Sequence, residues 1–193
     1  YFVFTSEFVT GIQNAAGSEA ANSFASGINQ ILGVGGGGLM TIGQMSEILV
    51  LACMPLLAKS LGRKSLLCIG LVAYAARMAL FAYMPSLPYV LAGVALHGVC
   101  FGCFIFVAFM VVDENTTKDV RATAQNLFNL VIVGIGIIVG SWFATAVVGS
   151  WANVDGVMDF AKLFSVPMYM AIGCLLLMLL FYPGRKSPAQ PAA

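Results

Sequence analysis

The chain has 193 residues, of which 60% are hydrophobic and only 9% are charged, and its formal net charge is +1 at pH 7. Soluble domains carry about 25% charged residues, so this composition predicts an integral membrane protein. The small net charge argues against nucleic acid as a partner, because nucleic-acid-binding proteins present a basic surface.

Apolar segments of membrane length follow one another along the chain, and a spanning helix needs about 20 residues. Residues 1–12 are typical of the outer end of a helix whose beginning is missing, so we expect a piece of a longer protein. Five complete spans are expected at 39–58, 65–84, 88–112, 123–149 and 163–182, before a tail at 183–193. The predicted fold class is therefore an all-α membrane protein with five complete transmembrane helices and the end of a sixth.

The basic residues predict the orientation in the membrane. Seven lie in the first and third short loops and in the tail (Lys59, Arg63, Lys64, Lys118, Arg121, Arg185 and Lys186), whereas Lys162 alone lies on the other side. Short cytoplasmic loops are rich in Lys and Arg. We therefore expect a cytoplasmic C-terminus and an outer loop at 7–38.

Two glycine patterns are notable. Residues 33–38 (GVGGGG) match G-x-G-x-x-G, but no strand precedes them and a span follows, so we expect a flexible linker rather than a dinucleotide site. Gly136 and Gly140 form a G-x-x-x-G in the fourth complete span, which predicts close packing of that span against a neighbour.

Glu47 lies inside the first complete span, where a charged side chain is unfavourable by about 2.5–3.5 kcal/mol on insertion scales. Gln44 precedes it by three residues, so both polar groups project from one face of a helix. An amide beside a carboxylate suits a polar ligand, and a desolvated carboxylate is able to load and release a proton.

Arg77 and His97 are the other ionisable residues well inside the spans. Glu47 and Arg77 lie about 12 Å and about 10 Å from the outer ends of antiparallel spans, so they are able to meet at one level. The alternatives are a pair that only stabilises packing and a Glu47 that faces a wet cavity. His97 shares a helix face with Phe101, where either a ligand ring or a bond to a neighbouring helix is compatible with the pattern.

Nothing in the sequence indicates an enzyme. There is one histidine, and neither a Ser/His/Asp set nor a metal-spaced cluster is present, so no catalytic residue, metal or cofactor is predicted. Cys100 and Cys103 form a C-x-x-C inside a membrane-length run, where helix packing is the expected role.

Four segments carry a resemblance to a known family. They are GQMSEILVLACMPLLAKSLGRKSLL, ARMALFAYMPS, HGVCFGCFIF and VDENTTKDVRATAQNLF, in that order within residues 43–149. Together they resemble the second half of a nucleoside–proton symporter of the major facilitator superfamily. The resemblance implies twelve spans in two six-helix halves that work by alternating access, with the end of the seventh span through the twelfth present here.

The resemblance also implies roles for individual residues. Gln44 and Glu47 match positions of the nucleoside site, with proton coupling through Glu47, and Phe101 matches an aromatic position of the tenth span. Two positions depart from the family pattern: His97 stands where a tyrosine is expected, and Gly102 stands where an aspartate is expected. Both departures bear on whether a nucleoside is the substrate.

Charges at the cytoplasmic ends admit two interpretations. In carriers of this superfamily such residues form pairs between helices that hold a gate in one state, and the alternative is charges in solvent that set the topology. The candidates are Arg63, Lys64, Asp113, Glu114 and Arg121, with Arg77 as a structural charge inside the membrane.

The sequence thus favours a proton-coupled symporter for nucleosides or a related polar solute, in the plasma (inner) membrane. A carrier for another substrate, such as a sugar, and a membrane scaffold without transport are the alternatives. The expected partners are the small solute, protons, the lipid bilayer and the missing N-terminal half of the same transporter, since the substrate cavity forms between the halves.

Overall fold

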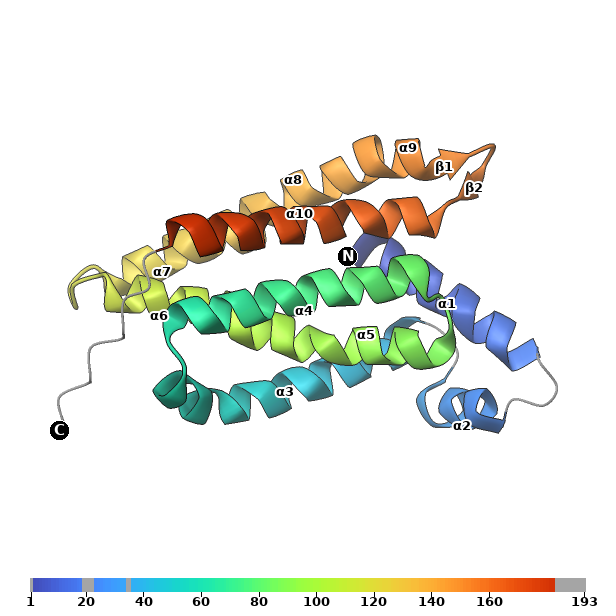
Figure 1. The fold of residues 1–193 in the computed structure, drawn as a ribbon, viewed down its shortest axis with the longest axis horizontal. Coiled ribbons are helices and arrows are strands. Elements are labelled where there is room, and N and C mark those ends of the chain that lie inside the picture. The colour runs from blue at the N-terminus through green and yellow to red at the C-terminus, as the bar shows by residue number, and fades with distance from the viewer. Residues whose placement is uncertain (1, 19–22, 34–35, 183–193) are drawn as a thin grey trace.

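A computed structural model describes residues 2–18, 23–33 and 36–182, and these are almost entirely helical (Figure 1). The first two helices are α1 (Phe2–Ser18) and α2 (Ser23–Leu32). Five helical segments are then long and apolar enough to cross a membrane: Gly37–Ser60, Arg63–Tyr83, Leu87–Glu114, Arg121–Ala152 and Phe160–Phe181. The five membrane-length helices of the predicted fold class are confirmed.

Three of these segments are single α-helices, namely α3 (Gly36–Ser60), α4 (Arg63–Tyr83) and α10 (Phe160–Phe181). The other two contain wider π-helical turns, which occur often at functional sites. The third comprises α5 (Leu87–Cys100), η1 (Phe101–Phe106) and α6 (Val107–Glu114). The fourth comprises α7 (Arg121–Asn129), η2 (Leu130–Ile135), α8 (Gly136–Trp142), η3 (Phe143–Gly149) and α9 (Ser150–Ala152).

A short antiparallel hairpin joins the fourth segment to α10. Its strands are β1 (Asn153–Val154) and β2 (Val157–Met158), with Asn153 opposite Met158. The turn places Asp155 and Gly156 at φ values of 52° and 84°, which are the positive values that two-residue hairpin turns require.

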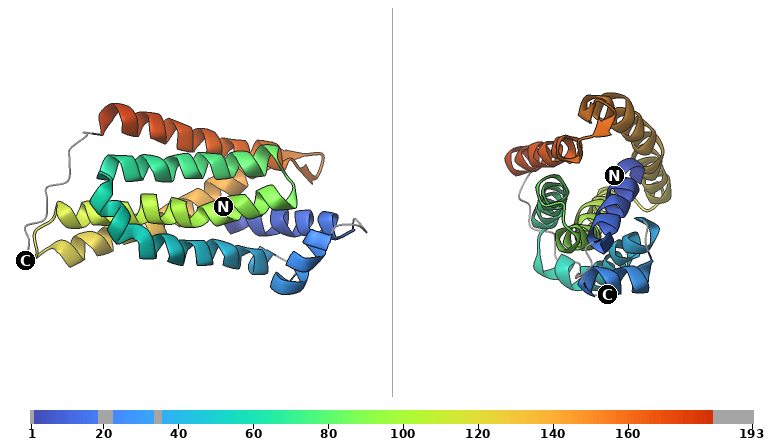
Figure 2. Two further views of the ribbon diagram at one scale, coloured as in Figure 1. Left: turned by 60° about the horizontal axis from the view of Figure 1, so that its bottom comes forward. Right: turned by 90° about the vertical axis from the view of Figure 1, so that its right-hand side faces the viewer.

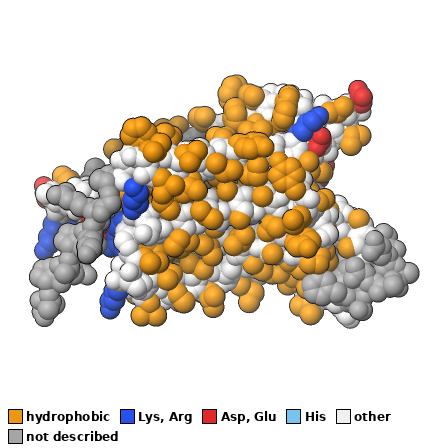
Figure 3. Space-filling view, in the orientation of Figure 1, with side chains coloured by type: hydrophobic (Ala, Val, Ile, Leu, Met, Phe, Trp, Pro, Cys, Tyr) orange, Lys and Arg blue, Asp and Glu red, His pale blue; other side chains and the backbone are white. Residues whose placement is uncertain are grey.

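The helices pack in the order α10, α4, α5, α3, with α1 against α3 and α5 (Figure 2). One buried cluster lies at the α1 end, where the rings of Phe8, Phe81 and Phe164 have centroids 5.0–5.6 Å apart. A second cluster around Met54 and Leu66 joins α3, α4 and the third segment at the opposite end. The outer faces are rich in apolar side chains, as expected for helices in lipid (Figure 3).

The segment before α3 differs from the expected flexible loop. The first helix continues to Ser18, a second helix covers Ser23–Leu32, and α3 already begins at Gly36. Gln13 is fully buried and donates hydrogen bonds to the Asn29 Oδ1 atom (3.0 Å) and to the Gly33 carbonyl oxygen (3.2 Å). These bonds tie α1 to α2. Because α3 already includes residues 36–38, the flexible-linker interpretation of residues 33–38 is wrong for their described part. Residues 34 and 35 lie outside it.

The predicted close packing at Gly136 and Gly140 is also absent from the described residues. A Cβ atom at Gly140 would meet nothing within 4 Å, and one at Gly136 would meet only the Val131 oxygen of its own helix. The two glycines leave a helix face without bulky side chains, but no other helix of the described chain covers that face.

Candidate functional site

The helices α3 and α5 approach each other so closely that backbone meets backbone. A Cβ atom at Gly98 would lie 2.3 Å from the Ser46 carbonyl carbon and 2.5 Å from the Glu47 nitrogen, so only glycine fits there. The Gly98 N–H donates to the Ser46 Oγ atom (3.0 Å), and that hydroxyl donates to the Gly43 oxygen (2.9 Å). Small residues allow this approach in membrane helices.

This contact brings Glu47 of α3 close to His97 of α5. The Glu47 Oε2 atom lies 3.8 Å from the His97 Nε2 atom, and the two side chains are 24% and 20% exposed. The other ring nitrogen, Nδ1, is 2.9 Å from the Arg77 Nη1 atom of α4. Arg77 is buried, with 1% exposure. Glu47 and Arg77 are thus linked in the structure, as their depths in the sequence allowed, but through an imidazole that sits between them.

Phe101 and Gln44 lie beside this chain of contacts. The rings of His97 and Phe101 have centroids 6.5 Å apart, and Phe101 is the first residue of the π-helical segment η1. Gln44 is exposed and lies one turn before Glu47 in α3. The four residues predicted to bind substrate therefore come from two adjacent helical segments.

Gly102 does not face this group. A Cβ atom there would lie 2.7 Å from the Val50 Cγ1 atom and 3.6 Å from the Met54 Cε atom, both in α3. Gly102 therefore allows α3 to pack against η1. A carboxylate at this position would require the two helices to separate or Val50 to move.

The charged residues at the end of the bundle opposite α1 form contacts between helices. Arg63, at the start of α4, has its Nε atom 3.0 Å from the Glu114 Oε1 atom at the end of α6. The Lys64 Nζ atom donates to the Leu179 and Tyr182 oxygens at the end of α10, over 2.9 and 2.7 Å. These contacts favour the paired interpretation of the charges over free charges in solvent.

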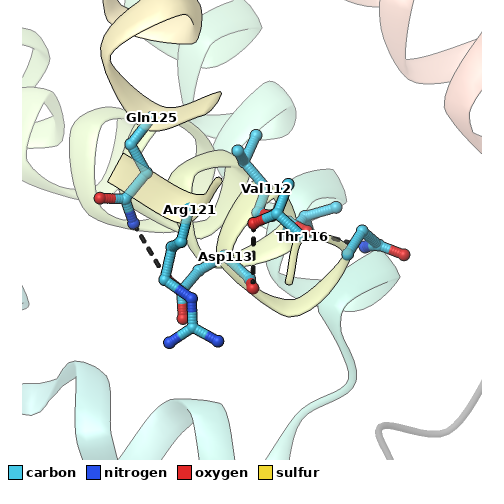
Figure 4. Close-up of polar contacts among 7 residues, drawn as sticks. Val112, Asp113, Thr116, Arg121 and Gln125 are labelled. Carbon is cyan, nitrogen blue, oxygen red and sulfur yellow. Dashed lines mark hydrogen bonds and ion pairs between the residues drawn. The ribbon is translucent and has the colours of Figure 1, made fainter. Parts of the chain in front are cut away.

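Asp113 completes this set and holds the start of the fourth segment (Figure 4). Its Oδ1 atom lies 3.0 Å from the Arg121 Nε atom and accepts a hydrogen bond from the Gln125 Nε2 atom (3.1 Å). Basic side chains gather at this end of the molecule, as the loop charges predicted (Figure 3).

A protein-family model described as Nucleoside H+ symporter matches residues 1–186. The chain belongs to the nucleoside–proton symporter family. This confirms the family that the sequence motifs resemble, and the match also covers the region outside residues 43–149.

Two named relatives are similar to this chain at low identity. The xanthosine permease of Escherichia coli (strain K12) is 29% identical over 157 residues, which are 79% of this chain and 37% of that protein. The nucleoside permease NupG of the same organism is 28% identical over 132 residues, covering 66% of this chain and 31% of the permease. This chain thus spans well under half the length of the curated relatives it matches.

The fold is shared with a solved transporter. A crystal structure of the nucleoside transporter NupG superimposes with a TM-score of 0.72 and 20% identity, over 93% of this chain and 48% of the other. This likeness confirms the predicted fold, and the chain corresponds to about half the length of that transporter.

Several residues that build the site escaped prediction from the sequence. Ser46 and Gly98 set the spacing of α3 and α5, and the acceptors of Lys64 are backbone oxygens. The close approach at Gly98 could have been predicted, because Gly98 and Gly102 have the same G-x-x-x-G spacing as Gly136 and Gly140.

Proposed function

We propose that this chain is the C-terminal half of a proton-coupled nucleoside symporter that works by alternating access. The observation that carries the proposal is the contact of Glu47 with His97, beside the exposed Gln44, inside membrane-length helices. A carboxylate is kept at such a depth when it binds a ligand, moves a proton or pairs with a cation. Family membership and relatives named as xanthosine and nucleoside permeases favour nucleosides as the substrate.

In this proposal each residue has a distinct role. Gln44 supplies both a donor and an acceptor to the base or the ribose, and Glu47 accepts hydrogen bonds from hydroxyl groups. Phe101 offers a ring for stacking against the base, and His97 lies between this ring and Glu47. Glu47 is also the group that loads and releases the coupled proton, because it is the only acid deep inside the five described spans.

The topology belongs to the same proposal. The five described spans are the eighth to the twelfth of the whole protein, and α1 is the end of the seventh. The basic end carrying Lys59, Arg63 and Lys64 faces the cytoplasm, together with the C-terminus, in the plasma (inner) membrane. The substrate cavity then lies between this half and an N-terminal half, which supplies the rest of the site.

The pairs at the cytoplasmic end are proposed to hold the gate. Arg63 with Glu114 joins α4 to α6, and Asp113 with Arg121 joins α6 to α7. A rearrangement that moves these helices apart must break the pairs. Each partly exposed pair contributes about 0.2–1 kcal/mol to the paired state, so breaking both is compatible with a transport cycle.

The test is uptake of radiolabelled nucleosides into vesicles that contain the full-length protein, with and without an imposed proton gradient. We expect Glu47→Gln to abolish gradient-driven uptake and Gln44→Ala to weaken nucleoside binding. The matched control is Glu7→Gln, the same chemical change at an exposed carboxylate of α1.

Radiolabelled sugars are tested in the same assay, with unlabelled nucleosides and sugars as competitors. Uptake of a sugar but of no nucleoside would replace the nucleoside by a sugar as substrate. Normal uptake by both site variants would contradict the site, and absence of uptake of either class of solute by a correctly inserted wild type would favour a scaffold.

A further inference from the structure

The contacts of His97 determine where its ring hydrogen must lie. An arginine guanidinium only donates hydrogen bonds, whereas a neutral imidazole has one donor nitrogen and one acceptor nitrogen. The Arg77 Nη1 atom is 2.9 Å from the His97 Nδ1 atom, so Nδ1 is the acceptor. The hydrogen of the neutral ring therefore lies on Nε2, the nitrogen that faces the Glu47 Oε2 atom at 3.8 Å.

We propose that His97 is a positioning residue for Glu47, with Arg77 holding the imidazole as the Nε2–H tautomer so that it presents a donor to the carboxylate. The bond to Arg77 also occupies the nitrogen that a second proton would need. The proton that the ring carries is thus directed at Glu47, and the carboxylate remains the group that exchanges protons. This deepens the proposed function and rests on it for its consequence in transport.

The surroundings of both partners support a fixed arrangement. Arg77 is fully buried, and its guanidinium carbon lies 5.6 Å from the centre of the Phe81 ring, one turn along α4. The backbone at His97 is held by its neighbour Gly98, which contacts Ser46 of α3 directly. Because Glu47 follows Ser46, the same contact sets the spacing between the imidazole and the carboxylate.

The 3.8 Å separation is longer than a direct hydrogen bond, which spans about 2.7–3.2 Å. A small shift of either side chain closes it, and a hydroxyl group inserted between the two atoms bridges it. The imidazole contacts Arg77 through Nδ1 and faces Glu47 through Nε2, so one ring joins both residues.

The first test measures the tautomer. The full-length protein is labelled with nitrogen-15 histidine, and the signals that disappear in His97→Gln are assigned to this residue. We expect a pyridine-like Nδ1 and a pyrrole-like Nε2 at neutral pH, and loss of this preference in Arg77→Met, with Lys118→Met in an exposed loop as control. A pyrrole-like Nδ1 in the wild type, or no change in Arg77→Met, would overturn the proposal.

The second test asks whether His97 acts through Glu47. A hydrogen bond to a charged group contributes about 1.5–3 kcal/mol, so His97→Phe should raise the KM for uptake about tenfold or more. His97→Gln should restore most of the wild-type KM, because its amide is able to accept from Arg77 and donate to Glu47.

The decisive comparison adds Glu47→Gln to each variant and measures nucleoside binding. We expect His97→Phe to change affinity by less than about twofold in that background. An equal loss with and without the Glu47 carboxylate would show that His97 contacts the substrate independently, and would overturn the proposal. If the wild type takes up no nucleoside, the proposed function fails, whereas the nitrogen signals still decide whether Arg77 orders His97.

Discussion

Two pairs of glycines with the same spacing lie in successive spans and have opposite surroundings. Gly98 and Gly102 are buried where α5 and η1 meet α3, and a Cβ atom at either would collide with α3. Gly136 and Gly140 are exposed in α8, where no neighbouring helix of the described chain covers them. The spacing alone thus predicts a surface that a helix is able to approach, not which helix approaches it.

The same contrast holds for the whole segments. In α4, 50% of the most apolar 18-residue window is buried inside the structure. In the corresponding window of Arg121–Ala152, only 6% is buried. The α3–α4–α5 region therefore builds its own interior and positions Glu47, His97 and Arg77. The fourth segment is attached mainly at its ends. We propose that the remainder of the transporter or lipid covers its length.

The largest effect is expected from Gly98→Ala. The added methyl would lie 2.3 Å from backbone atoms of Ser46, so α3 must move away and the contact of Glu47 with His97 is lost. Overpacking of this kind lowers the free energy of unfolding by about 1–3 kcal/mol. Unfolding of the full-length protein in detergent should show this loss of stability, together with reduced uptake. Gly140→Ala is the matched control, and equal effects of the two would contradict the comparison.

A smaller effect is expected from Gly140→Leu in the full-length protein. If the missing part of the transporter packs on α8, the bulky side chain should destabilise by about 1 kcal/mol, at the low end for overpacking. Unchanged thermal unfolding and uptake would show that this face lies in lipid. The measurement therefore decides which surroundings complete the fourth segment.

Asp113→Asn should loosen the start of the fourth segment. The carboxylate contacts Arg121 and accepts from Gln125, and both charged partners are partly exposed, at 36% and 40%. Partly exposed pairs contribute about 0.2–1 kcal/mol to stability. Hydrogen exchange should accelerate in Arg121–Asn129 and stay unchanged in α4. Asp155→Asn, in the exposed hairpin turn, serves as control, and identical exchange in α7 of both variants would argue against this attachment.

The smallest effect is expected at Asp159, which caps the N-terminus of α10 directly after the hairpin that follows the fourth segment. Its Oδ1 atom accepts a hydrogen bond from the Lys162 backbone N–H (3.1 Å), and this bond lowers the pKa of the carboxyl below its usual value. Since the folded pKa is below the unfolded value of about 4, the stabilisation is complete above that pH and is lost as the pH falls through the lowered pKa.

The measurement for Asp159 is the difference in Tm between the wild type and Asp159→Ala. We expect the wild type to be more stable near neutral pH and the difference to shrink in acid. A difference that is constant down to the lowest accessible pH would rule out the ionised cap as its cause.

The sequence by itself determined the helices that cross the membrane and the family. Every backbone polar group in lipid must be paired within its own segment, so a long apolar run is compatible with little except a helix. The four motif segments within residues 43–149 together sufficed for the family, which the match over residues 1–186 confirms. The helix at the start of the chain was expected, but the end of α1 and all of α2 were not, because they depend on buried bonds such as those of Gln13.

Only the tertiary structure decided which polar groups meet. Depth along the helices placed Glu47 and Arg77 at one level, but the rotation of α5 inserted His97 between them. That rotation follows from the contact of Gly98 with Ser46, and from Gly102 against Val50. Helix periodicity specifies a face of each helix, whereas the partner of that face depends on the packing of all helices together.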